Sequence, residues 1–288
     1  MAEGPTIEPD RLEPGSLSPA PPPPASPLPS ASAQVLRRLH RSYNQLLVLC
    51  VVLIGAYALP AGLNRLVVMA CFTLMPLVLL RGIGHGSPAL PLQPWARRGY
   101  RVLGLLSLLA FLFWTFTPLG LRHSGLPVLV LWTLFVGWSS VRLVKGLARE
   151  PLVNGPVLQG AMAGYLLLGM TAGLLFAALE TLHPGSFTSV HHAGGQLVAP
   201  WAVSLDHDPL VYQVDMVRFH YYALVTLTTT GYGDILPVTP QAQMASMALA
   251  LVGTVYVAVV MALLISRLTV QESAGPRRGP PGSDGDGI

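Results

Sequence analysis

The chain has 288 residues, of which 52% are hydrophobic and only 10% are charged. Soluble domains use roughly 25% charged residues, so this composition is typical of an integral membrane protein. The formal net charge is +4, but the arginines flank apolar runs instead of forming one face, which argues against nucleic-acid binding.

The first segment is rich in proline, serine and alanine, including the run Pro21 to Pro24. It has too little apolar surface to repay the cost of ordering. We expect residues 1–36 to be a disordered cytoplasmic tail. No signal-peptide pattern occurs in it.

Six apolar runs follow, and each is compared with the roughly 20 residues that a helix needs to cross a bilayer. They cover about residues 45–59, 64–80, 102–121, 126–144, 157–182 and 244–265. Cys50 and Cys71 fall inside the first two runs, so no disulfide framework is expected. The sequence predicts an all-α integral membrane protein with six transmembrane helices.

Basic residues gather in alternate connections between these runs. Arg37, Arg38 and Arg41 precede the first; Arg81, Arg97, Arg98 and Arg101 join the second and third; Arg142, Lys145 and Arg149 join the fourth and fifth; Arg267, Arg277 and Arg278 follow the sixth. Because cytoplasmic loops carry the excess of Lys and Arg, we expect a multi-pass protein of the cell membrane with both termini in the cytoplasm. The opposite connections contain Glu180, Asp206, Asp208, Asp215 and Asp234, and such an anionic outer side concentrates cations.

The fourth run carries no charge from Ser124 to Ser140, and no carboxylate lies in the first four runs. Unpaired charges within a membrane are costly. We therefore interpret the basic residues that follow it as orientation signals and not as gating charges. Residues 37–150 are predicted to form a four-helix scaffold without evident voltage-sensing arginines.

A short amphipathic stretch lies between the fifth and sixth runs. Asp215 can cap a helix that continues to about Thr228, a length of roughly 20 Å at 1.5 Å per residue. Such a helix is too short to cross the membrane and must enter and return, as a re-entrant pore helix buried in protein or lining a cavity. The negative end of its dipole favours a cation.

The residues that follow read Thr-Thr-Thr-Gly-Tyr-Gly-Asp, from Thr228 to Asp234. Several successive carbonyl groups can face one axis only if the backbone alternates between right- and left-handed conformations, which Gly231 and Gly233 adopt without steric cost. Thr229 adds a hydroxyl oxygen, and Tyr232 is expected to point away from the axis as a spacer. The alternative, a turn between two strands, is disfavoured because a polar loop cannot face lipid.

The stretch Phe219 to Ile235, with Pro237 and Pro240 after it, resembles the pore helix and selectivity filter of bacterial-type potassium channels. Residues 253–260 resemble the inner helix of that family. The resemblance implies a pore domain over residues 151–270, and four chains around one axis. By the mechanism established for such channels, backbone carbonyls then replace the hydration shell of K⁺. The filter residues implied are Thr229, Thr230, Gly231, Tyr232 and Gly233, with K⁺ at the first four.

Other residues are candidates for support of this filter. Thr228 precedes it, and Thr230 stands where the family most often has Val or Leu, which is a tolerated variant. Some family members pair the filter Asp with a pore-helix carboxylate, but the matching position is Val225. We expect Asp234 to hydrogen-bond to Tyr221 or Tyr222 instead.

Glu180 and Gly253 each have two interpretations. Glu180 is the only carboxylate inside an apparent span; by the resemblance it accepts hydrogen bonds from backbone amides at the start of the sixth span, and otherwise it reaches headgroup water. Gly253 lies within the inner helix at a cost of roughly 1 kcal/mol against Ala. It is either a gating hinge or a site of close helix packing.

The sequence thus predicts a homotetrameric potassium channel in a lipid bilayer, with K⁺ as permeant ion, no other cofactor and no enzymatic activity. The alternatives are a non-conducting regulatory subunit and a weakly voltage-dependent channel. The outer loop contains His183, His191, His192 and His207, which we interpret as solvated side chains in preference to a proton or metal site. Residues 271–288 are predicted to be a disordered cytoplasmic tail.

Overall fold

The computed structural model describes residues 30–82, 93–117, 125–149, 153–189 and 215–273. Most of the proline-rich tail and the last fifteen residues of the predicted C-terminal tail lie outside this part of the chain. So do Asp206, Asp208, His191, His192 and His207.

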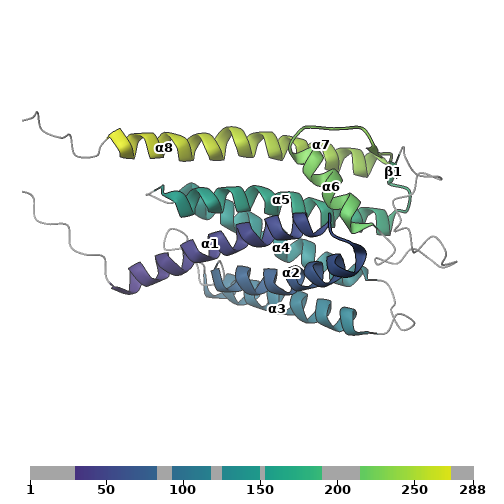
Figure 1. Cartoon of the computed structure of the whole chain (residues 1–288), viewed down its shortest axis with the longest axis horizontal. Helices are drawn as coiled ribbons and strands as arrows, with labels where there is room; N and C mark the ends of the chain where they lie inside the picture. The colour runs from purple at the N-terminus through teal and green to yellow at the C-terminus, as the bar shows by residue number, and fades with distance from the viewer. Residues whose placement is uncertain (1–29, 83–92, 118–124, 150–152, 190–214, 274–288) are drawn as a thin grey trace, which may run out of the picture.

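Five long helices run alongside one another: α1 (Ser30–Ala56), α2 (Ala61–Gly82), α3 (Pro94–Phe116), α4 (Leu126–Arg149) and α5 (Gly155–Leu182). A short helix, α6 (Met216–Leu227), precedes a long final helix made of α7 (Pro240–Val255), the π-helical segment η3 (Tyr256–Met261) and α8 (Ala262–Ser273). Figure 1 shows that α1 begins and α8 ends at one end of the bundle, here called the terminal end, whereas α6 lies at the other, the loop end.

The two strands, β1 (Phe187–Ser189) and β2 (Ile235–Pro237), pair antiparallel at the loop end. Phe187 lies opposite Pro237, and Ser189 lies opposite Ile235. This small sheet joins the segment after α5 to the segment that follows the predicted filter. Its role is therefore to fix the far end of that loop.

Several helix boundaries differ from the sequence predictions. The first helix begins at Ser30, inside the predicted tail, because Ala31, Ala33 and Gln34 favour a helix even where little apolar surface is available. The third helix ends at Phe116 and not at Leu121. Thr117 is already extended, as expected for a residue that precedes a proline.

Five helices are long and apolar enough to span a membrane among the described residues, and they include α2, α3, α4, α5 and the α7–α8 helix. The first predicted span is not among them. Only residues 40–56 of α1 are described in full, and this stretch is shorter than the 18 residues that a candidate span requires. The described structure therefore supports five of the six predicted spans by length and composition.

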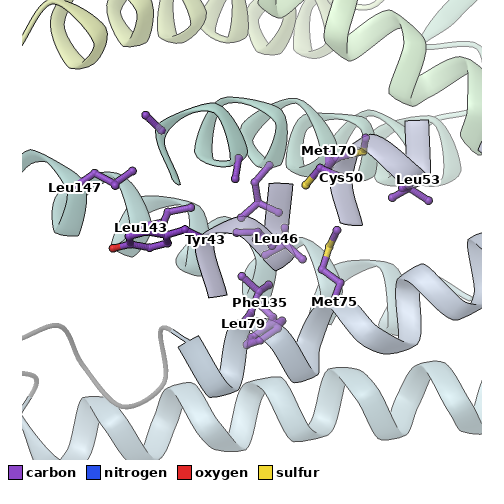
Figure 2. Packing of buried hydrophobic residues seen from close by; sticks show 14 of the residues in the cluster. Tyr43, Leu46, Cys50, Leu53, Met75, Leu79, Phe135, Leu143, Leu147 and Met170 are labelled. Atoms are coloured by element: carbon purple, nitrogen blue, oxygen red, sulfur yellow. The ribbon is translucent and has the colours of Figure 1, made fainter. Parts of the chain in front are cut away.

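The main core lies between α1, α2, α4 and α5. Figure 2 shows side chains from these four helices meeting in one cluster, among them Leu46, Met75, Phe135 and Met170. Cys50 and Cys71 are buried there as free thiols. One face of α5 packs on this core while α6 and α7 pack on α5, so α5 connects the scaffold to the candidate site.

Candidate functional site

The short helix α6 is built as the sequence predicts. Asp215 caps it, with Oδ1 accepting a hydrogen bond from the Arg218 amide at 3.2 Å and Oδ2 lying 3.0 Å from the Arg218 guanidinium. Its 12 residues give a length of about 18 Å. The helix packs closely on α5 because Gly169 and Gly173 leave room for Leu224 and His220, whose side-chain atoms would lie 2.5 Å and 2.7 Å from an added Cβ.

The backbone of the loop after α6 alternates in handedness. Thr229, Gly231 and Gly233 have positive φ angles of 58°, 55° and 78°. The two glycines were predicted to do so. Thr229 was not, and it is the one non-glycine residue with positive φ in the described part of the chain, where an L-residue is strained. The alternation thus begins at Thr229, two residues before the first of the two glycines.

Amides and carbonyls of this loop have different environments. The amides of Thr229, Thr230 and Gly231 donate to carbonyls at the end of α6, those of Thr226 and Val225. Among the described residues, no donor reaches the carbonyl oxygens of residues 229–233. Buried carbonyl groups are almost always paired, but these residues are exposed in the single chain, so their oxygens are open to a partner from outside it. This row is therefore available to a ligand that accepts electron pairs, such as a cation.

The threonine hydroxyls at the base of the loop are linked. Thr228 Oγ1 donates to the Leu224 carbonyl at 2.9 Å and lies 2.9 Å from Thr230 Oγ1. Thr228 thus ties the start of the loop to the last turn of α6.

The two candidate tyrosines separate into different roles. Tyr221 hydrogen-bonds to Asp234 and stacks on Tyr232, with ring centroids 6.4 Å apart and planes at 6°. Tyr222 instead donates to Ser246 Oγ on α7 at 2.8 Å. Asp234 therefore pairs with Tyr221, and the Tyr232 ring is directed at α6, although it remains 70% exposed in a single chain.

Glu180 is buried, which excludes the interpretation that it reaches headgroup water. Its Oε1 accepts from the Gly185 amide at 2.8 Å and its Oε2 from the Phe187 amide at 3.0 Å. Backbone amides are its partners, as predicted, but they belong to β1 and the turn before it and not to the start of the last span. The segment just before the last span is fixed by a different hydrogen bond, in which the Val238 amide donates to the Ser186 carbonyl at 2.8 Å.

Gly253 lies against the end of α6. A Cβ added there would lie 2.1 Å from the Leu227 carbonyl oxygen, far closer than any real contact. The same carbonyl accepts a hydrogen bond from the Tyr165 hydroxyl of α5 at 3.1 Å. Close packing therefore accounts for this glycine without a hinge.

The π-helical segment begins three residues after Gly253 and is anchored to α5. Tyr256, at its start, is buried and donates to the Ala161 carbonyl at 2.6 Å. Gly164 leaves the space for this hydroxyl, which would lie 2.9 Å from an added Cβ. The sequence predicted one continuous span here. It gave no sign of the π-helical segment, whose first residue, Tyr256, contacts a residue of another helix.

Sequence reasoning missed His220. The ring is buried, with Nδ1 2.7 Å from the Met216 carbonyl and 3.2 Å from the Tyr57 hydroxyl. Tyr57 lies between α1 and α2, so this contact joins α6 to the scaffold. The sequence could have indicated that His220 is buried, because it lies on the same face of α6 as the apolar residues Phe219 and Ala223.

The comparisons with known proteins agree with this location. A family model described as an ion channel matches residues 196–270, which include α6, the loop after it and most of the last helix. No curated protein matches the chain significantly. The chain therefore combines several helices that are long and apolar enough to cross a membrane with a segment that is similar to an ion-channel family.

Proposed function

We propose that this protein is a potassium-selective channel, in which residues 229–233 form the selectivity filter and K⁺ passes down its gradient. The observation that carries the proposal is the alternation of φ at Thr229, Gly231 and Gly233 beside five carbonyl groups that no donor of the described residues reaches. Rings of such carbonyls replace the hydration shell of K⁺ in potassium channels generally. The C-terminal end of α6 adds the negative end of a helix dipole.

Four copies of the chain are required, because one chain supplies only one wall of the filter. Residues 228–233 are exposed in the single chain, and polar backbone cannot face lipid. Apolar side chains on α7 are exposed as well, including Met244, Met247 and Leu251. A homotetramer would bury both. In this arrangement α6 is the re-entrant pore helix, and α1 supplies the sixth span so that both termini lie in the cytoplasm.

Voltage sensing by the scaffold has little support. The part of α4 before Arg142 carries no charge, and Arg142 itself lies over the Tyr100 ring, 4.4 Å from its centroid. Helices α1 to α4 then act as a scaffold that reaches the pore helix through the contact between Tyr57 and His220.

The test is ion flux through the purified protein in liposomes, with K⁺ compared with Na⁺ and Ba²⁺ as blocker. We expect K⁺ flux far above Na⁺ flux and block by Ba²⁺. Equal fluxes would refute selectivity. Absence of flux at every voltage and pH would favour the regulatory subunit.

Gly231→Ala tests the filter assignment directly. Alanine in a left-handed conformation is strained by about 1–2 kcal/mol, so the alternation should be lost and conduction abolished while the tetramer still assembles. Gly185→Ala is the matched control. Gly185 also has positive φ, 84°, and open space around it, but it lies outside the loop, so this variant should keep selective flux. Selective conduction by Gly231→Ala would disprove the assignment.

A further inference from the structure

Helix α3 begins and helix α4 ends at the terminal end of the bundle (Figure 1), and both of these segments are rich in basic residues. On α4, Trp138, Arg142, Lys145 and Arg149 are spaced by four, three and four residues and therefore share one face. On α3, Arg97 and Arg101 are one turn apart. The two helices pack against each other, and Arg142 of α4 lies over the ring of Tyr100 of α3, so these two segments are neighbours.

Two of the arginines, Arg97 and Arg142, are half-buried. Arg142 lies on the face of Tyr100, which is fully buried and whose hydroxyl is 2.8 Å from Ser139 Oγ. Arg97 is close enough to repel Arg142 electrostatically. Its Nε is buried and has no hydrogen-bond partner among the described residues.

The charge at this place exceeds what orientation requires. No Asp or Glu occurs between Glu13 and Glu150, and Arg101 and Lys145 add exposed positive charge. Basic residues that only orient a membrane protein extend into water. A half-buried pair of like charges with an unsatisfied donor is costly, and an anion held between the two helices would relieve both costs.

We propose that these basic residues bind the phosphate group of an anionic membrane phospholipid. Basic pockets between transmembrane helices on the cytoplasmic side are suited to lipid head groups. Two features favour a lipid over a free phosphate. Trp138 is 37% exposed and lies edge-on to Tyr100 at 6.0 Å, where an aromatic ring suits the membrane interface. Leu105 and Leu109 continue along α3 as exposed apolar side chains that offer contacts to an acyl chain.

The experiment measures binding to the full-length protein in detergent, by native mass spectrometry and by thermal unfolding. The probes are phosphatidylglycerol, zwitterionic phosphatidylcholine, and glycerol 3-phosphate. We expect phosphatidylglycerol to be retained and to raise the unfolding temperature, and phosphatidylcholine to do neither. The same effects from glycerol 3-phosphate would support the phosphate site and assign it to a soluble ligand. Equal retention of both lipids, with no effect of glycerol 3-phosphate, would overturn the proposal.

Arg97→Gln and Arg98→Gln form a matched pair, because adjacent residues on a helix point about 100° apart and Arg98 is exposed. Arg97→Gln should weaken phosphatidylglycerol binding about fivefold, and Arg98→Gln should weaken it by less than twofold. Without lipid, Arg97→Gln should also unfold at a higher temperature, since the repulsion is gone. Equal losses in the two variants would show diffuse surface attraction and refute a built site. Lys145→Gln is the second variant, and it should weaken phosphatidylglycerol binding about as much as Arg97→Gln does. Unchanged binding by this variant would contradict the assignment of Lys145 to the site.

Discussion

Gly253→Ala separates the two explanations of this glycine, a packing site and a gating hinge. The added Cβ would lie 2.1 Å from the Leu227 carbonyl oxygen and 3.0 Å from the Leu227 carbonyl carbon. To reach even 3.0 Å from the oxygen, α7 and the end of α6 must separate by about 0.9 Å. Because the opposing atoms are backbone, no side-chain rotation relieves the clash.

The magnitude follows from two opposing effects. Overpacking of a core costs about 1–3 kcal/mol, and a contact with backbone lies at the upper end of that range. Alanine regains roughly 1 kcal/mol of helix propensity over glycine. The net destabilisation should be about 2 kcal/mol. The movement should also displace Leu227, which precedes Thr228 at the base of the filter loop, so selective flux should fall.

The measurement is SDS-induced unfolding followed by helical circular dichroism, together with K⁺ flux in liposomes. Gly146→Ala is the control, because Gly146 is a helical glycine of α4 with no heavy atom within 4 Å of an added Cβ. It should leave stability unchanged or raise it by up to about 1 kcal/mol. If Gly253→Ala were as stable as Gly146→Ala and changed only the opening of the channel, the packing argument would be refuted and the hinge restored.

Two further substitutions test the contacts around the loop. Glu180→Gln leaves one acceptor oxygen where two amides now donate, so one buried donor should lose its partner at a cost of about 1–3 kcal/mol; an unchanged SDS unfolding curve would contradict this role. Tyr165→Phe removes only the hydroxyl that donates to the Leu227 carbonyl, and should lower stability by about 1 kcal/mol and reduce the ratio of K⁺ to Na⁺ flux. An unaltered ratio with the expected loss of stability would limit Tyr165 to a structural role.

The ends of a helix could be predicted from the sequence where one nearby residue, such as a capping residue, sets the boundary. Asp215 as cap and the end of α6 near Thr228 follow from capping preference and length. The α3 end at Phe116 and the start of α1 at Ser30 were misplaced by a few residues. In both places the prediction relied on apolar composition, whereas Pro118 and the helix-forming alanines set the boundary.

Partners across the fold were less predictable. The sequence placed a carboxylate at Glu180 and a tyrosine pair beside Asp234, but which amide and which tyrosine they meet depends on how far each helix is rotated and shifted against its neighbours. The buried contact of His220 with Tyr57 joins residues 163 positions apart, and no local pattern encodes it.

The sequence by itself supplied the alternating glycines, which permit the left-handed backbone at Gly231 and Gly233 because glycine has no Cβ. The pattern of glycines did not show that Thr229 joins the alternation, although the bond from its amide to the Thr226 carbonyl is local to the end of α6. Only the tertiary structure assigned Gly253 to packing, because the approach of α7 to Leu227 is set by helices that meet only in the folded chain.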